Sequence, residues 1–170
     1  MSGGKDWPEL FTETLSQMLD EPFPASEGLR VLFDYAIWDT VRLDLFLQDG
    51  RLEAQLLNWP KIKDAERWSK LAPDARKAFE KIFQRRSAAL TGAEADYFPG
   101  FLQELEKAVH GEVIEPVAGY PLDGAECWVR VLRAGKISRL YQWDSHYQTR
   151  GVMAQAERLF DRVNRQVNPL

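Results

Sequence analysis

Two runs of alternating apolar and polar residues, joined by an Asp-Gly pair, constrain the fold of this chain more than any other feature. The alternation extends over residues 41–47, where only Phe46 breaks the polar face, and resumes over residues 52–56. Between the runs, Asp49-Gly50 supplies the two positive-φ positions that a type I′ turn requires. The pattern therefore predicts a β-hairpin in which each strand has one apolar face.

Four other segments predict strands. Cys127–Arg133 and Ile137–Trp143 flank an Ala134-Gly135 pair, which predicts a second hairpin, and a short strand is expected over residues 112–118. Residues 29–38 fit both a helical stripe and strand alternation. Their β-branched and aromatic content favours a strand.

The remaining segments predict helices. Asp6 is placed to cap a first helix, which the prolines in Glu21–Pro24 end. A short helix is expected around residues 62–68. Pro73 suits the first position of a longer helix that ends at Gly92.

The longer helix has a consistent apolar stripe, and two further helices follow it. The residues of the stripe are Ala75, Ala78, Phe79, Ile82, Phe83 and Leu90. Arg86 lies on the same side by its helical angle, where an arginine would extend to water. A third helix is expected from Pro99 to His110, and Thr149 is placed to cap the last one.

These segments together predict one α+β domain over residues 1–170, with residues 1–5 disordered. Its antiparallel sheet is built from two hairpin or meander segments, at about 30–57 and 112–143, with N-terminal, central and C-terminal helices packed on it. A chain of 170 residues buries enough surface to fold without a disulfide or metal.

Few residues point to catalysis. Cys127 is the only cysteine, and it lies in an apolar strand beside Glu126, which favours a packed thiol over a nucleophile. His110 and His146 are the only histidines, so a multi-histidine metal site is excluded, and phosphate-loop and nucleophile-elbow motifs are absent. We therefore expect no cofactor, no metal and no catalytic residue, with a non-catalytic role favoured over an enzyme.

Charge is distributed in blocks along the chain. The net charge is −4, but residues 1–60 and 91–126 each carry −7, whereas residues 61–90 and 127–170 each carry +5. Opposite blocks facing each other in the fold would explain this pattern, and so would a segregated acidic surface that steers a basic partner.

The second explanation supplies a set of candidate partner-binding residues. The set combines acidic residues of the two negative blocks with the two tryptophans, of six, that we expect to be partly exposed. Its members are Asp39, Asp44, Asp49, Trp59, Glu94, Asp96 and Trp143. Asp34, Asp44 and Glu53 are further expected to share the solvent-facing side of the first hairpin's sheet. Tryptophan is enriched at binding hot spots, although it also fills cores.

In general layout the chain is similar to bacterial immunity proteins, which neutralise toxins. The matching features are the acidic meander Asp39–Asp49 with its Asp49-Gly50 hairpin and the acidic segment Glu94–Glu126. The likeness implies a protein-binding inhibitor whose acidic surface blocks a basic toxin or enzyme, with no membrane involved. The alternative is a small enzyme or ligand-binding protein with a carboxylate-lined pocket.

Nucleic-acid binding is the weaker reading of the last 44 residues. Arg130, Lys136 and Arg139 mix with Trp128 and Tyr141 on the predicted second hairpin, as in single-strand binders. The acidic blocks and a pI near 5.3 argue against it. The sequence shows no secretory signal and no long apolar run, which predicts the cytoplasm.

Overall fold

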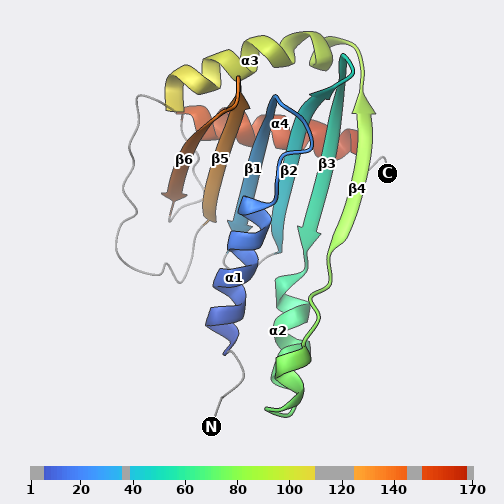
Figure 1. Ribbon diagram of the computed structural model, residues 1–170, viewed down its shortest axis with the longest axis vertical. Helices are drawn as coiled ribbons and strands as arrows, with labels where there is room; N and C mark the ends of the chain where they lie inside the picture. The colour runs from blue at the N-terminus through green and yellow to red at the C-terminus, as the bar shows by residue number, and fades with distance from the viewer. Residues whose placement is uncertain (1–5, 36–38, 110–124, 145–150, 168–170) are drawn as a thin grey trace.

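The computed structural model describes residues 6–35, 39–109, 125–144 and 151–167. They form a six-stranded antiparallel sheet with helices on both faces (Figure 1). The strand order is β4-β3-β2-β1-β5-β6. The strands are β1 (Gly28–Tyr35), β2 (Thr40–Gln48), β3 (Arg51–Trp59), β4 (Gln84–Leu90), β5 (Ala125–Arg133) and β6 (Lys136–Asp144).

The helices divide between the two faces of the sheet. α1 (Trp7–Asp20) crosses one face, whereas α3 (Ala93–Val109) and α4 (Gly151–Val167) lie on the other (Figure 1). α2 (Lys61–Ser69) continues from the lower end of β3 and is followed by a 3-10 turn, Ala75–Ala78. The predicted α+β class, with N-terminal, central and C-terminal helices on an antiparallel sheet, is confirmed.

Strand alternation produces two apolar cores. The larger core lies between the sheet and the α3–α4 pair and contains residues such as Val31, Leu43 and Val129. The smaller core lies under α1, where Met18 and Leu19 pack near Trp59. The two-residue period thus places alternate side chains of β1, β3 and β5 in the two cores.

Local signals in the sequence placed the first helix and both hairpins correctly. Asp6 and Glu9 form a reciprocal capping box, and α1 ends at Asp20 with Glu21 as its C-cap. Asp49 and Gly50 have φ values of 52° and 75°, as a type I′ turn requires. β1 confirms the strand interpretation for residues 29–35, and residues 36–38 of that prediction lie outside the described residues.

The long helix predicted from Pro73 to Gly92 is wrong. Residues 84–90 instead form β4, which pairs with β3 so that Ala88 lies opposite Ala54 and Leu90 opposite Leu52. The apolar spacing fits a helix, but β3 offers a complete row of hydrogen-bonding groups, and tertiary pairing overrides a weak local preference.

The third helix also begins earlier than predicted. α3 starts at Ala93 and contains Pro99, which we expected at its first position. The predicted strand at 112–118 and the Thr149 cap lie outside the described residues.

Candidate binding site

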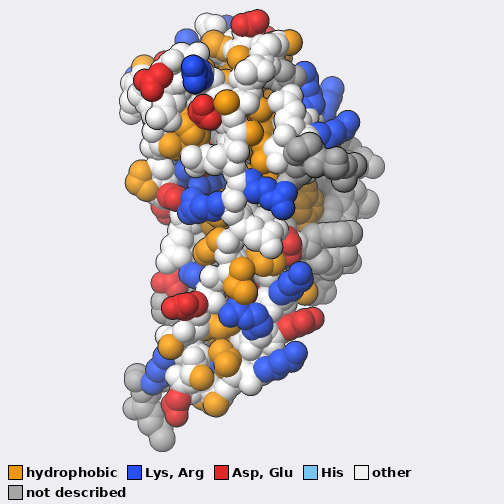
Figure 2. Space-filling view, turned by 90° about the vertical axis from the view of Figure 1, so that its right-hand side faces the viewer, with side chains coloured by type: hydrophobic (Ala, Val, Ile, Leu, Met, Phe, Trp, Pro, Cys, Tyr) orange, Lys and Arg blue, Asp and Glu red, His pale blue; other side chains and the backbone are white. Residues whose placement is uncertain are grey.

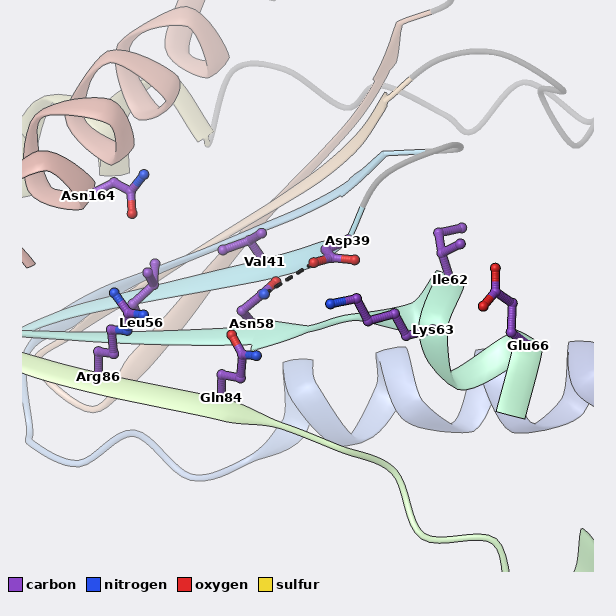
Figure 3. Close-up of a pocket in the computed structure, with 10 residues that line it drawn as sticks. All are labelled: Asp39, Val41, Leu56, Asn58, Ile62, Lys63, Glu66, Gln84, Arg86 and Asn164. Carbon is purple, nitrogen blue, oxygen red and sulfur yellow. Dashed lines mark hydrogen bonds between the residues drawn. The ribbon is translucent and has the colours of Figure 1, made fainter. Parts of the chain in front are cut away.

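A cavity of about 720 Å³ lies on the α4 side of the sheet, beside α2. We call it the β4 cavity, because the edge strand β4 forms one wall (Figure 3). Its lining comes from five elements and from the residue preceding β2: Asp39, Val41, Leu56, Asn58, Ile62, Lys63, Glu66, Gln84, Arg86 and Asn164. Most of these side chains are polar, whereas the rest of this face is an apolar core.

The floor of the cavity contains an amide with an unused acceptor. Asn58 Nδ2 donates to Asp39 Oδ2 at 3.2 Å, as Figure 3 shows. Asn58 Oδ1 is buried and accepts no hydrogen bond from the described residues. A buried acceptor without a donor costs free energy, and a ligand N–H or O–H at this point would remove that cost.

The cavity walls carry both signs of charge. Lys63 and Glu66 come from the first turns of α2, and Arg86 comes from β4 (Figure 3). Within the described part of the chain, these three side chains form no ion pair. They are therefore available to a charged partner, in contrast with the buried charges on the opposite face.

Beneath α1, the opposite face carries the buried charge network of Arg30, Arg42, Asp44 and Glu21. Arg30 binds Asp44 through two bonds of 2.7 and 3.0 Å, and Arg42 reaches the same carboxylate at 3.0 Å. Burial lowers the pKa of Arg42, while Asp44 acts in the opposite direction. Arg42 also pairs with Glu21 at the rim of the network.

The arginines of this face also bind the end of α1. Arg42 donates to the Met18 carbonyl at 2.6 Å and Arg30 to the Leu19 carbonyl at 2.9 Å. Arg130 on β5 donates to the Leu19 carbonyl as well. The last carbonyls of a helix lack partners within it and favour nearby cations. The network therefore has a structural role, which is to hold α1 against the sheet.

Two more buried carboxylates also have structural partners. Asp64 accepts hydrogen bonds from Trp59 Nε1 at 2.9 Å, from Arg67 at 2.6 Å and from the Ile82 N–H at 3.0 Å. It thus ties α2 to the end of β3 and to the segment before β4. Asp34 binds both Lys61 and the Thr40 hydroxyl at 2.5 Å.

Asp34, Asp44 and Glu53 share one face of the sheet, as predicted, but the prediction that this face meets solvent is wrong for the first two. α1 packs over the face, and Asp34 and Asp44 are buried with cations as partners. Buried carboxylates persist only when they are paired in this way.

The side chains of Cys127 and Tyr141 are poor nucleophiles. Burial raises the pKa of the Cys127 thiol well above its usual value, and the charge of Glu157 adds to the shift. Burial also raises the pKa of Tyr141, whose hydroxyl donates to Glu126 at 2.6 Å. Both groups are neutral at pH 7, and Cys127 fills the core as the sequence predicted.

The candidate partner-binding residues do not form one surface. Asp44 and Trp59 are 1% and 0% exposed, so neither can contact a partner of the folded protein, and their assignment is corrected. Trp59 fills the core under α1 and stacks on Phe11. Its indole N–H can be buried there because it donates a hydrogen bond to Asp64.

The other described candidates, Asp39, Asp49 and Asp96, come from different segments of the chain. Asp39 precedes β2 at the lower end of the sheet, whereas Asp49 is in the β2–β3 turn at the upper end (Figure 1). Asp96 is exposed on α3. The side chains of Glu94 and Trp143 lie outside the described set. Only Asp39 among them lines the β4 cavity.

Sequence reasoning missed Asn58, Gln84 and Arg86. One available signal was Arg86, because a charged residue does not fit the apolar stripe of the predicted helix, and it no longer conflicts when residues 84–90 form a strand. Asn58 could have been noticed as a polar residue in phase with Leu52, Ala54 and Leu56.

Comparison with protein-family models, with curated proteins and with solved structures finds no match to this chain. Among the described residues, acidic, histidine and cysteine side chains do not gather in threes as a metal site would need. The helices of the described ranges are also too short or too polar to span a membrane.

Proposed function

We propose that this chain is a non-catalytic binding domain whose partner is another protein. The observation that carries the proposal is β4, an edge strand that is exposed over most of its length and forms a wall of the β4 cavity. Edge strands in natural proteins are normally short, covered or otherwise protected, because they offer unpaired backbone groups to other chains. An exposed edge beside a cavity with unpaired charges supports a docking function.

The chemistry of the buried groups is consistent with this role. The buried charge network, Asp34 and Asp64 each bind partners within the domain, and their contacts hold α1 and α2 in place. Lys63, Glu66 and Arg86, which form no ion pair within the described chain, lie instead around the β4 cavity. Inhibition of a toxin or other enzyme, as immunity proteins perform it, stays a prediction of this proposal.

The test is capture of partners from the lysate of the producing cells by tagged wild type and by two variants. Arg86→Glu changes the cavity wall, and Arg139→Glu makes the same change on β6, the other edge strand. We expect one stoichiometric protein that wild type and Arg139→Glu retain and Arg86→Glu loses. Hydrogen exchange of the complex should slow at β4. Partner capture that is equal for all three proteins would contradict the proposal.

A second candidate function is binding of a small polar ligand in the β4 cavity. Two observations favour ligand binding. Oδ1 of Asn58 has no hydrogen-bond donor among the described residues, and the cavity also carries the Asp39 and Glu66 carboxylates. A ligand that binds only the folded state must raise the melting temperature. A metabolite panel in which a hit shifts wild type but not Asn58→Ala would support this function, and a panel without any shift would count against it.

A further inference from the structure

Among the described residues, the outer edge of β4 is not paired with another strand. β4 pairs with β3 on one side, and no strand of the described residues pairs with it on the other. An antiparallel or parallel segment could hydrogen-bond to this edge and extend the sheet, which is a common mode of peptide recognition. The side chains of Ser87, Ala88 and Ala89 are small, so they leave the backbone of β4 accessible.

The two faces of β4 differ in what they offer an incoming strand. Gln84 and Arg86 face the β4 cavity, together with their ladder partners Asn58 and Leu56. Arg85 faces the α1 side, where it pairs with Glu21 at 3.1 Å. Alternate side chains of a seventh strand would therefore point toward the cavity and toward the end of α1.

The chain segment that forms this edge is basic. Residues 61–90 carry a net charge of +5, and Figure 2, which views the molecule from the β4 side, shows Lys and Arg side chains along this face with Asp and Glu side chains among them. Lys63, Arg86 and Arg158 have no carboxylate partner in the described chain. Such a surface attracts acidic segments and speeds their association.

Apolar side chains lie next to the same edge. Ile82 and Phe83 directly precede β4 and are 43% and 36% exposed, and Ile62 is exposed at the cavity. Exposed large apolar groups beside a polar cavity mark binding surfaces. The edge thus suits a segment that mixes acidic and apolar residues.

We propose that β4 binds an extended acidic segment of the partner protein as a seventh strand of the sheet. Alternate carboxylates of the segment lie near Arg86 and Lys63 at the β4 cavity, and its apolar residues contact Ile82 and Phe83. This inference rests on the proposed function and adds to it the chemistry and backbone conformation of the partner.

A defined peptide tests the inference. The probe is a fluorescein-labelled, eight-residue peptide of alternating glutamate and valine, titrated with the full-length protein and followed by fluorescence anisotropy. One comparison peptide has lysine in place of glutamate, and another is N-methylated on every backbone amide. We expect saturable binding of the glutamate peptide alone, since the second peptide has the wrong charge and the third cannot pair with β4.

Matched variants locate the site. Arg86→Glu should weaken binding of the glutamate peptide roughly tenfold and make it less sensitive to salt. Arg139→Glu, with the same change on β6, should leave the affinity unchanged. Both substituted positions are exposed, so an unchanged melting temperature is expected and serves as the folding control. Hydrogen exchange should slow at the β4 amides when the peptide is bound.

Three results would overturn the inference. One is equal binding of the N-methylated peptide, and another is preference for the lysine peptide, which would indicate the basic partner that the sequence predicts. The third is a dimer in solution that protects β4, which would make a second copy of this chain the occupant. If the peptide fails but Arg86→Glu still abolishes capture of a natural partner, the inference fails and the proposed function stands.

Discussion

The two faces of the sheet use charged residues in different ways. On the α1 side, Arg30, Arg42 and Asp44 are almost fully buried and bind one another and the end of a helix. On the α4 side, Lys63 and Arg86 line an open cavity and form no ion pair with the described residues. Residue type alone therefore does not reveal function here, because helix packing decides whether a charge stabilises the fold or is left for a partner.

Removal of the Asp44 carboxylate should cause the largest loss of stability and so gives the strongest test of this contrast. Asp44→Ala leaves two buried guanidinium groups without their carboxylate, and the loss of one partner of a buried pair costs about 3–5 kcal/mol. Urea unfolding of this variant should show a loss of that size. The matched control is Asp96→Ala on the exposed surface of α3, with an expected change within about 0.5 kcal/mol. Similar losses in both variants would refute the structural role of the network.

Removal of Asp64 should have the next largest effect. Asp64→Ala leaves Trp59 Nε1 and the Ile82 N–H without an acceptor, and unsatisfied buried donors cost about 1–3 kcal/mol each. We expect a total loss of about 2–3 kcal/mol in chemical unfolding, together with faster hydrogen exchange at Ile82. Asp74→Ala, which removes an exposed carboxylate that makes no cap bond, is the control. An unchanged exchange rate at Ile82 would contradict the assigned contact.

Glu21 sharpens the comparison because it lies at the rim of the buried charge network. Burial disfavours ionisation of Glu21, but the hydrogen bond and charge of Arg42, with those of Arg85, outweigh it and lower the pKa of Glu21 from its usual value. A depressed pKa gives stability that is present above the unfolded pKa and lost as the pH falls through the folded pKa.

Glu21→Gln should therefore be less stable than wild type at pH 7, and the difference should shrink as the pH falls through the lowered pKa of Glu21 in the folded protein. Solvent screening of this half-exposed side chain keeps the difference below about 1 kcal/mol. Thermal unfolding at a series of pH values provides the measurement. A difference that grows on acidification would have the wrong sign and would reject the pairing with Arg42.

Arg86 should show the smallest effect on stability. Arg86→Ala removes an exposed side chain that forms no ion pair in the described chain, so its free energy of unfolding should change by less than about 0.5 kcal/mol. Arg42→Ala is the contrasting variant, since Arg42 binds Asp44, Glu21 and the end of α1. Equal losses from the two substitutions would remove the distinction between a structural and a partner-facing charge.

Much of the fold was predictable, whereas little of the candidate site was. Caps and turns depend on hydrogen bonds and backbone angles within a few residues, so the sequence alone predicts them. The examples here are Asp6, Asp49-Gly50 and Ala134-Gly135. β4 depends on β3, a partner about 30 residues away, and its own apolar spacing fits a helix equally well. Arg86 and Gln84 join the cavity only because that pairing forms.

The amino-acid sequence by itself determined the alternating strands, their turns and the capped first helix, because each depends on short-range sterics and hydrogen bonds. Only the tertiary structure decided that the polar faces of β1 and β2 lie under α1 while β4 remains at an edge. The physical reason is that a strand's pattern states which residues share a face but not what covers it. Coverage by α1 therefore gives Asp44 a structural role, whereas the edge position of β4 leaves Arg86 exposed beside a cavity.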